Sequence, residues 1–344
     1  MTQVLGGTRG LDTAGNLGHY RARDGSPGAT VRIDLDNPHV GLIVGKRGYG
    51  KSYTLGVLVE ELADAEGVTP VVVDPIGVFT TFEGVSGFEV VSDPRVSADT
   101  LSPRAWCDLL GLDHESATGS LVWRAVSETS TLAEMRDFVS EADANPATCR
   151  SARNHLALAA SWDVFSSNGL TAAACVEPES GILLDCSGCD HAPMNAVVRA
   201  VAGDLYRARV AESIDTLPWL VVDEAHAFFG GIADAALRTI ITRGRHPGVS
   251  LVAATQRPAA LPEVAISQSD LLVAHRLTSR RDRDALARAR PTYMQGSFTD
   301  RMPETPGSAV IVDDATERVH SVQIRKRQVE HGGGSPSANE LRKG

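Results

Sequence analysis

Long apolar runs are missing from this sequence, and so is any N-terminal leader pattern. A membrane-spanning helix needs about 20 consecutive apolar residues, and no run approaching that length occurs. The first residues lack a basic segment followed by an apolar one, which argues against a secretory signal peptide. These absences predict a soluble cytoplasmic protein with no membrane span.

Cysteine is also scarce. The chain has 5 cysteines, and an odd number in a cytoplasmic chain does not indicate a disulfide framework. Cys186 and Cys189 have CxxC spacing with His191 close by, but a zinc site needs a second ligand pair, and no CxxC or HxxxH partner is present. A redox pair remains an alternative. Residues 181–185 before it are typical of a core strand, so we interpret these cysteines as part of a strand-to-helix turn.

Lysine is the rarest charged residue: 4 lysines stand against 29 arginines, and 25 aspartates against 18 glutamates, for a net charge of −10. This balance fits a proteome adapted to high salt and equally fits a GC-rich genome, so both interpretations stay open. A chain this acidic is not expected to coat its whole surface with nucleic acid. Any such contact is expected to be local, for example along the lining of a channel.

What the sequence does contain is a glycine-rich loop between a predicted strand and a predicted helix. Residues 45–52, GKRGYGKS, match GxxxxGK[ST], the phosphate-binding loop of nucleoside triphosphatases. Apolar residues 39–44 indicate a buried strand before it, and residues 53–62 after it are apolar at helical spacing. Glycines let the backbone N–H groups point at phosphate oxygens, and the start of the helix adds free donors.

This loop predicts a site for ATP with Mg²⁺. Lys51 is expected to reach the β- and γ-phosphates, and Ser52 is expected to hold the metal. A plain glycine turn would need neither the lysine nor the hydroxyl. The predicted nucleotide-binding residues are Gly45, Lys46, Arg47, Gly48, Tyr49, Gly50, Lys51, Ser52 and Tyr53.

An acidic pair follows a second apolar run. Residues 219–222 precede Asp223 and Glu224, and ligands bind at the carboxyl ends of parallel strands. Asp223 is predicted to hold Mg²⁺, and Glu224 to orient and polarise the attacking water. With Ala225 and His226 the motif spells DEAH, as in two-lobed helicases, but the chain has room for one nucleotide-binding lobe and an insertion. We therefore interpret His226 as a local contact.

A polar residue ends the next apolar run. Gln256 lies in the segment ATQRP, residues 254–258, and is predicted to bond a phosphate oxygen or the attacking water. Arginines just before this strand suit the charge that develops on the γ-phosphate, often from a neighbouring subunit. A surface helix cap is the alternative for each of them. The predicted catalytic residues are Glu224, Lys51, Gln256, Arg245 and Arg243.

Strands and helices alternate along most of the chain. This predicts an α/β fold with a mainly parallel sheet covered on both faces. Between residues 97 and 180 the apolar positions instead recur at helical spacing, which predicts an inserted helical subdomain. Buried strands are predicted at 71–74, 182–185, 219–223, 250–254, 271–275 and 309–313, and core helices at 196–209 and 232–242.

The chain divides into four predicted parts. Residues 1–30, rich in glycine and polar residues, are predicted to form an irregular N-terminal arm, and 97–180 the helical insertion. Residues 31–96 and 181–328 are predicted to form the ATPase core. The tail, 329–344, contains GGGSPS and is predicted to be disordered.

These motifs together resemble the HerA/FtsK superfamily of DNA-pumping ATPases, nearer the HerA branch. The likeness covers about residues 30–325, and ATQRP placed after the acidic strand is its most specific part. The matching segments are GKRGYGKS, Asp74-Pro75, VVDEAH (221–226), GVSLVAATQRP (248–258) and HRLTS (275–279) with Asp282.

The resemblance implies a RecA-like P-loop NTPase core, a helical insertion and a hexameric ring. It also implies the roles given above for Lys51, Ser52, Asp223, Glu224 and Gln256. It further implies an arginine that acts across the subunit interface, for which the candidates in order are Arg245, Arg243 and Arg276.

HerA-branch members that process DNA ends carry a small β-barrel before the core, and about 38 residues before His39 are too few for one. We therefore predict a ring ATPase that translocates double-stranded DNA, as a helicase, translocase or genome-packaging motor, with a nuclease or capsid component as a candidate protein partner. An ATPase that remodels or assembles a protein partner without DNA is the alternative. The pathway, the direction of movement and the DNA-contacting loops are not fixed by the sequence.

Overall fold

The computed structural model describes residues 3–7, 13–22, 26–289 and 301–332. Within them, 12 strands form one sheet in the order β1-β3-β2-β12-β11-β10-β4-β9-β8-β5-β7-β6. The strands are β1 (Gln3–Leu5), β2 (Ala14–Arg21), β3 (Pro27–Asp34), β4 (Val40–Val44), β5 (Val68–Asp74), β6 (Phe88–Val91), β7 (Gly181–Asp185), β8 (Leu217–Val222), β9 (Ser250–Thr255), β10 (Leu271–Ala274), β11 (Ser308–Asp313) and β12 (Arg318–Ile324).

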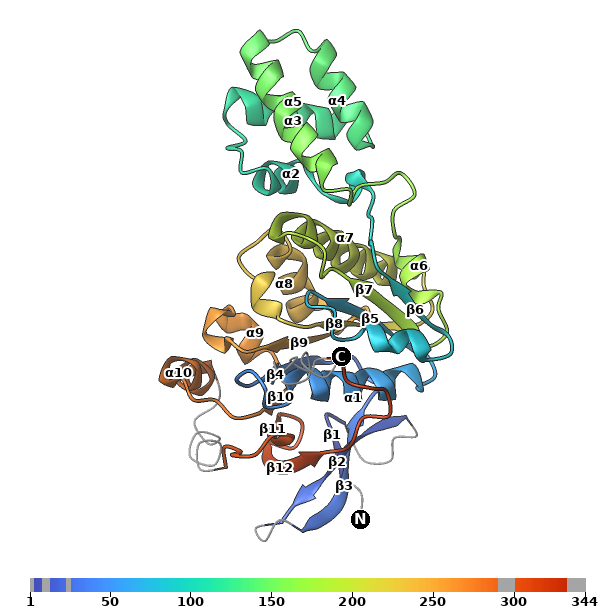
Figure 1. Ribbon diagram of the computed structural model, residues 1–344, viewed down its shortest axis with the longest axis vertical. Helices are drawn as coiled ribbons and strands as arrows, with labels where there is room; N and C mark the ends of the chain where they lie inside the picture. Colours follow the sequence, from blue (N-terminus) through green and yellow to red (C-terminus); the bar gives the residue numbers. More distant parts are fainter. Residues whose placement is uncertain (1–2, 8–12, 23–25, 290–300, 333–344) are drawn as a thin grey trace, which may run out of the picture.

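The helices surround this sheet and extend beyond it (Figure 1). In the described part of the chain no helix is both long and apolar enough to cross a membrane. The helices are α1 (Lys51–Ala63), α2 (Pro103–Leu109), α3 (Ala117–Glu128), α4 (Leu132–Glu141), α5 (Pro146–Ser161), α6 (Ala172–Val176), α7 (His191–Val210), α8 (Asp234–Arg243), α9 (Glu263–Ser267) and α10 (Arg280–Ala289).

The half of the sheet from β10 to β6 is parallel throughout. Helix α1 covers one of its faces, and α7 and α8 cover the other (Figure 1). Because both faces are buried, its strands are continuous apolar runs rather than alternating ones, and every residue of β5 is buried. The predicted α/β fold with a mainly parallel sheet is therefore confirmed.

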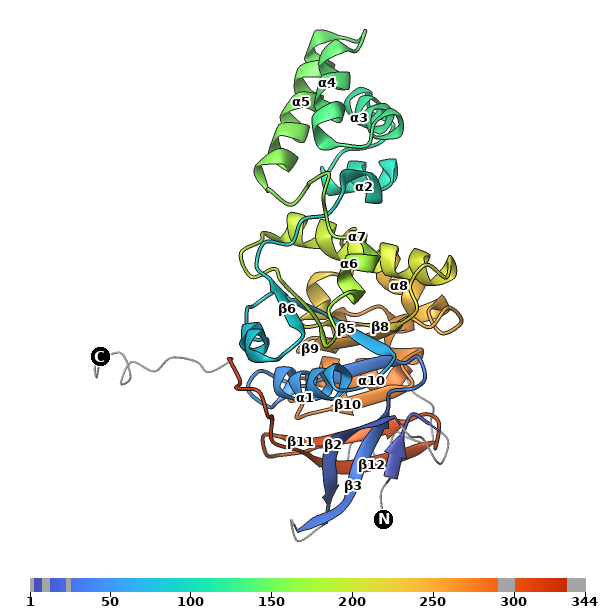
Figure 2. The same cartoon turned by 90° about the vertical axis from the view of Figure 1, so that its right-hand side faces the viewer.

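Helices α2 to α5, which follow β6 and precede β7 in the chain, project from one end of the molecule (Figure 2). Local signals define them: Thr131 and Glu134 form a reciprocal capping box at the start of α4, and Ser116 caps α3. At their base, Trp106 stacks near Phe165 with ring centroids 4.7 Å apart. The range predicted as a helical insertion thus contains α2 to α6, while its independence as a domain stays a prediction.

The prediction of an irregular arm over residues 1–30 is wrong, because β1, β2 and the start of β3 lie there. Glycine in this region marks a close approach of two strands instead of a loop. At Gly18, with φ of 149°, an added Cβ would lie 2.0 Å from the backbone oxygen of Gln323 in the paired strand β12. A register shift at Asn16 and Gly18 accompanies this contact.

The predicted disordered tail also needs a partial correction. Residues 329–332 lie against the core: the Val329 N–H donates to Glu60 at 3.0 Å, and Thr81 donates to the carbonyl of Glu330 at 2.7 Å. These hydrogen bonds fix a stretch whose composition is otherwise typical of a flexible tail. The rest of the predicted tail, 333–344, lies outside the described residues.

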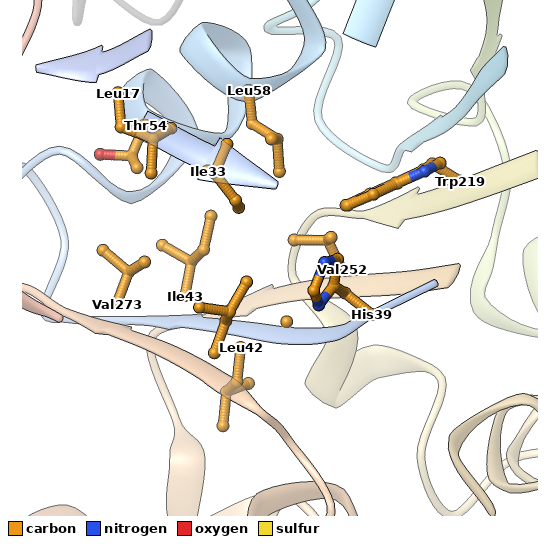
Figure 3. A pocket seen from close by; sticks show the side chains of 12 residues that line it. Leu17, Ile33, His39, Leu42, Ile43, Thr54, Leu58, Trp219, Val252 and Val273 are labelled. Carbon is orange, nitrogen blue, oxygen red and sulfur yellow. The ribbon is translucent and has the colours of Figure 1, made fainter. Parts of the chain in front are cut away.

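A small cavity of about 20 Å³ lies between α1 and the sheet (Figure 3). Its lining is almost entirely apolar, so water has no partners there, and it has no room for a nucleotide. His39 lies at its edge beside the Trp219 ring, with ring centroids 5.6 Å apart. This void belongs to the core packing.

His39 is a buried histidine held between two carboxylates. Its Nδ1 lies 2.8 Å from Asp270 and its Nε2 3.7 Å from Asp34. Burial opposes the charged form, but hydrogen bonds and charge from Asp270 and Asp34 outweigh it and raise the pKa of His39 to about 9. The imidazolium therefore ties β4 to its neighbours near neutral pH.

This ion pair predicts that the protein loses stability in alkaline solution. The folded pKa lies above the ordinary value of 6.5, so the contribution is complete below about pH 6.5 and is lost as pH rises through about 9. The free energy of unfolding is expected to fall by about 3 kcal/mol over that window. Denaturant melts at several pH values measure it, and a His39→Gln variant with the same pH dependence as wild type would contradict the assignment.

Candidate nucleotide-binding and hydrolysis site

The glycine-rich loop connects the carboxyl end of β4 to the start of α1. Gly45, Gly48 and Gly50 have φ values of 157°, 81° and 109°. At Gly45 an added Cβ would lie 2.6 Å from the Cβ of His275, so no larger residue fits without displacing that side chain. The loop conformation thus depends on glycine and on the residue packed behind it.

His275 supports the loop from the end of β10. Its Nδ1 donates to the carbonyl of Ser308 at 2.9 Å, and its Nε2 accepts from the Thr54 hydroxyl at 2.9 Å. Burial lowers the pKa of His275 to about 4, so the ring is neutral. The sequence motif HRLTS contains this histidine, but nothing in its pattern indicated a role beside the phosphate loop.

Ser52 and Asp223 meet at the start of α1. The Ser52 hydroxyl donates to Asp223 Oδ2 at 2.7 Å. Burial raises the pKa of Asp223 to about 6, against the hydrogen bonds from Ser52 and the Glu224 N–H. A desolvated carboxylate beside a hydroxyl is the hard oxygen pair that Mg²⁺ accepts together with substrate phosphates. These residues therefore fit the predicted metal, and Ser52 and Asp223 would hold it.

Glu224 lies next to this pair in an unusual backbone conformation. Its φ of 44° and ψ of 42° are left-handed, and its N–H donates to Asp223 Oδ1 at 2.8 Å. Burial raises the pKa of Glu224, but the His226 contact and the Lys51 charge outweigh burial and hold it below the ordinary value. The side chain is therefore a carboxylate, the form that accepts a proton.

Lys51 is buried at the first position of α1, with 6% of its surface exposed. Burial lowers the pKa of Lys51, while the charges of Glu224 and Asp223 oppose that shift. A desolvated ammonium balanced by carboxylates is ready to bind the more negative triphosphate. Lysine as a compact point charge suits this task.

A cleft of about 970 Å³ opens over these residues. It brings together Arg47, Lys51, Ser52, Glu224 and Gln256, which come from three separate parts of the chain. Tyr53 lines it as well. Sequence reasoning missed the remaining walls of the cleft, residues 76–78, 306–307, 323–326 and 331–332.

The predicted arginines do not reach this cleft. Arg243 and Arg245 are exposed and precede β9, whereas the phosphate loop follows the carboxyl end of the parallel strand β4. Arg243 and Arg245 therefore lie at the amino ends of the parallel strands, whereas the cleft of the same subunit lies at their carboxyl ends. Arg276 lies nearer, at the end of β10, with its guanidinium 5.7 Å from the ring centroid of Tyr49.

Lys46 is predicted to bind nucleotide, but its backbone is engaged elsewhere. Its N–H donates to the carbonyl of Arg276 at 2.8 Å, and its Nζ lies 4.6 Å from the ring centroid of Tyr49. It does not line the cleft. This lysine fixes the first turn of the loop against β10, which leaves Lys51 as the buried lysine of the loop.

The C-terminal strap, residues 325–332, forms one wall of the cleft over α1. Arg325 pairs with Glu60 and Glu61 at 2.6 Å each, and Arg327 Nε lies 3.5 Å from Glu60. Glu60 Oε1, which Arg327 also contacts, accepts the N–H groups of Gln328 and Val329, both at 3.0 Å. The buried Glu60 therefore holds four residues of the strap, and Glu61 is a second partner of Arg325.

Removing the charge of this anchor is expected to destabilise the protein. Glu60→Gln leaves the buried Arg327 without its counter-charge and weakens the Arg325 pair, at a cost of about 3 kcal/mol. Glu66→Gln, an exposed position just beyond the same helix, is the matched control and is expected to change little. Urea unfolding measures both, and equal stability of the two variants would show that Glu60 does not anchor the strap.

The CxxC pair lies in a turn between β7 and α7, as interpreted from the sequence. The Cys186 N–H donates to the carbonyl of Asp74 at 2.9 Å, and the Cys189 N–H donates to that of Cys186 at 2.9 Å. Both cysteines are free thiols. Among the described residues no group of three or more His, Cys, Asp or Glu side chains is arranged to hold a metal ion.

A parallel sheet with a phosphate loop after one strand, and an acidic pair after another, defines a P-loop nucleoside triphosphatase. Residues 16–165 match the family model for the central domain of the helicase HerA. The DNA double-strand break repair helicase HerA of Pyrococcus furiosus is 25% identical over 371 residues, which cover 86% of this chain and 67% of that protein.

Solved structures share the fold. VirB4 of Thermoanaerobacter pseudethanolicus superposes with a TM-score of 0.71 at 17% identity, over 93% of this chain and 98% of that one. The plasmid coupling protein TrwB with an ATP analogue gives 0.61 at 15% identity, over 95% and 97%. The chain is thus similar to HerA in sequence over residues 16–165, and it shares its fold with these P-loop proteins.

Proposed function

We propose that this protein is a ring-shaped motor that hydrolyses ATP and translocates double-stranded DNA. The observation that carries the proposal is the convergence of Lys51, Ser52, Glu224 and Gln256 on one cleft, with Ser52 bonded to Asp223. Such a site has both the parts that bind a triphosphate and the acid that activates water. A ring that only bound ATP would not need that acid.

The residues of the cleft have separate tasks in hydrolysis. Loop N–H groups and Lys51 bind the phosphates and balance the charge that develops on the γ-phosphate. Mg²⁺, held by Ser52 and Asp223, would supply further neutralisation of that charge. Glu224 orients the attacking water and accepts its proton, and Gln256 bonds the water or a phosphate oxygen.

The ring part of the proposal rests on the arginines. Arg243 and Arg245 lie at the sheet edge away from their own cleft, so they serve hydrolysis only if they reach the site of a neighbouring subunit. A head-to-tail ring provides such a contact. The resemblance to the HerA/FtsK superfamily implies a hexamer as the expected assembly. Arg245 remains the first choice and Arg243 the second.

DNA as the cargo is supported by the HerA relative, whose name describes a DNA repair helicase. We further propose a cytoplasmic location and a nuclease or a capsid component as the protein partner. A net charge of −10 requires that DNA contacts be confined to one part of the surface. Binding is then expected to weaken steeply with salt.

The test is ATPase activity with and without duplex DNA over a range of salt, together with the native mass of the assembly. We expect stimulation by DNA that fades as salt rises, in particles of six subunits. Hydrolysis that ignores DNA at every salt concentration, with a stable protein partner recovered instead, would favour an ATPase that remodels protein. The Glu224→Gln variant provides the background rate.

A further inference from the structure

His226 connects the catalytic acid to the neighbouring strand. It lies in a single helical turn, Ala225–Ala227, directly after β8 and the acidic pair. Its Nδ1 is 3.2 Å from Glu224 Oε2 and 3.2 Å from the Thr255 hydroxyl. Glu224 Oε2 is buried and forms no hydrogen bond with the described residues, so its contact with Nδ1 is a charge contact, which is favourable when Nδ1 carries the proton.

The partner hydroxyl is itself fixed. Thr255 is fully buried at the end of β9, the parallel neighbour of β8, and its oxygen accepts the N–H of Arg257 at 3.0 Å. The end of β9 thus contacts Glu224 indirectly, through the histidine.

Glu224 depends on these contacts for its direction. Its left-handed backbone lies outside both helix and strand, so regular secondary structure does not fix where its side chain points. A general base works only when its oxygen is held within hydrogen-bond reach of the water, and a misplacement of about 1 Å costs about 100-fold in rate. The histidine supplies the missing constraint.

We propose that His226 is a positioning residue for ATP hydrolysis, which fixes the Glu224 carboxylate through Nδ1 and is itself fixed by the Thr255 hydroxyl. The inference rests on the proposed ATPase function and deepens it. The histidine of the DEAH motif then has a role within a single nucleotide-binding lobe and requires no second helicase lobe.

The test compares variants that keep or remove the Nδ1 donor. The amide nitrogen of His226→Asn occupies nearly the same place as Nδ1, whereas His226→Ala has no donor. We expect kcat to fall about 100-fold in the alanine variant, with KM for ATP nearly unchanged, and to recover most of that loss in the asparagine variant. Binding of a non-hydrolysable ATP analogue and thermal melting confirm that each variant is folded.

Substitutions of Thr255 provide a second pair of variants. Thr255→Val keeps the shape and removes the hydroxyl, and is expected to lower kcat about 10-fold, while Thr255→Ser retains activity. Because the two residues act on Glu224 as one unit, the double variant of His226→Ala and Thr255→Val is expected to be no slower than His226→Ala alone.

Wild-type turnover in His226→Ala would overturn the inference, and so would an asparagine variant as slow as the alanine one, which would indicate packing alone. A fully additive double variant would remove the link through Thr255. If wild-type protein itself hydrolyses no ATP, the proposed function fails, and the inference fails with it. These results are distinguishable because the wild type is measured first.

Discussion

Glu224→Gln is expected to stop ATP turnover while leaving ATP binding intact. The amide keeps the size of the side chain but accepts no proton, and general-base catalysis contributes about 10²- to 10⁴-fold. Lys51 and the phosphate loop, which hold the triphosphate, are unchanged by this substitution. Phosphate release under steady-state conditions, together with the amount of bound ATP after filtration, measures the two effects separately.

Glu128→Gln is the matched control, because this glutamate is exposed at the end of α3, far along the chain from the cleft. It is expected to hydrolyse ATP at the wild-type rate. Equal turnover in wild type and Glu224→Gln would show that the catalytic assignment is wrong. Loss of ATP binding in Glu224→Gln would show instead that the acid contributes to holding the nucleotide.

Local spacing made much of the site predictable from the sequence. A strand, a glycine loop and a helix must be adjacent in the chain to form a phosphate site, so residues 45–52 could be recognised directly. The acidic pair and Gln256 follow apolar strands, and parallel strands place their carboxyl ends at one edge of the sheet. The alternation of strands and helices along the chain predicts a parallel sheet covered on both faces, and the apolar strands then identify the core residues.

Contacts between distant segments explain what the sequence did not reveal. Strand β2 pairs with the following strand β3 on one side and with β12, about 300 residues later, on the other, whereas its glycines look like loop residues on their own. The C-terminal strap depends largely on Glu60, a buried carboxylate more than 260 residues earlier in the chain. His275 lies in the HRLTS segment, but its place behind Gly45 depends on three-dimensional packing that the segment alone does not indicate.

For the arginines, the sequence predicted a catalytic role but not their position in the fold. Their residue type and place before a strand fit catalysis, yet the direction of β9 puts Arg243 and Arg245 at the edge away from the phosphate loop. A motif states which residues precede a strand, and the strand direction states which edge they occupy. Only an assembly can bring them to a nucleotide, so their role stays a prediction.

Lys51→Ala is expected to remove both turnover and nucleotide binding. The buried ammonium is balanced by Glu224 and Asp223, and without it the triphosphate meets two carboxylates with no counter-charge between them. Loss of one charged donor to the transition state costs about 10²- to 10³-fold in rate. Because ligands that bind only the native state raise its stability, Mg-ATP is expected to raise the melting temperature of wild type and not of this variant.

Lys46→Ala separates this effect from a general loss of charge in the loop. Both lysines lie within the same eight-residue motif, but Lys46 packs over Tyr49 and does not line the cleft. Its variant is expected to keep the thermal shift with Mg-ATP, as is Glu224→Gln. A thermal shift that survives in Lys51→Ala and disappears in Lys46→Ala would reverse the assignment of the two lysines. A shift lost in Lys51→Ala alone places the γ-phosphate at the buried lysine, where Glu224 can direct water against it.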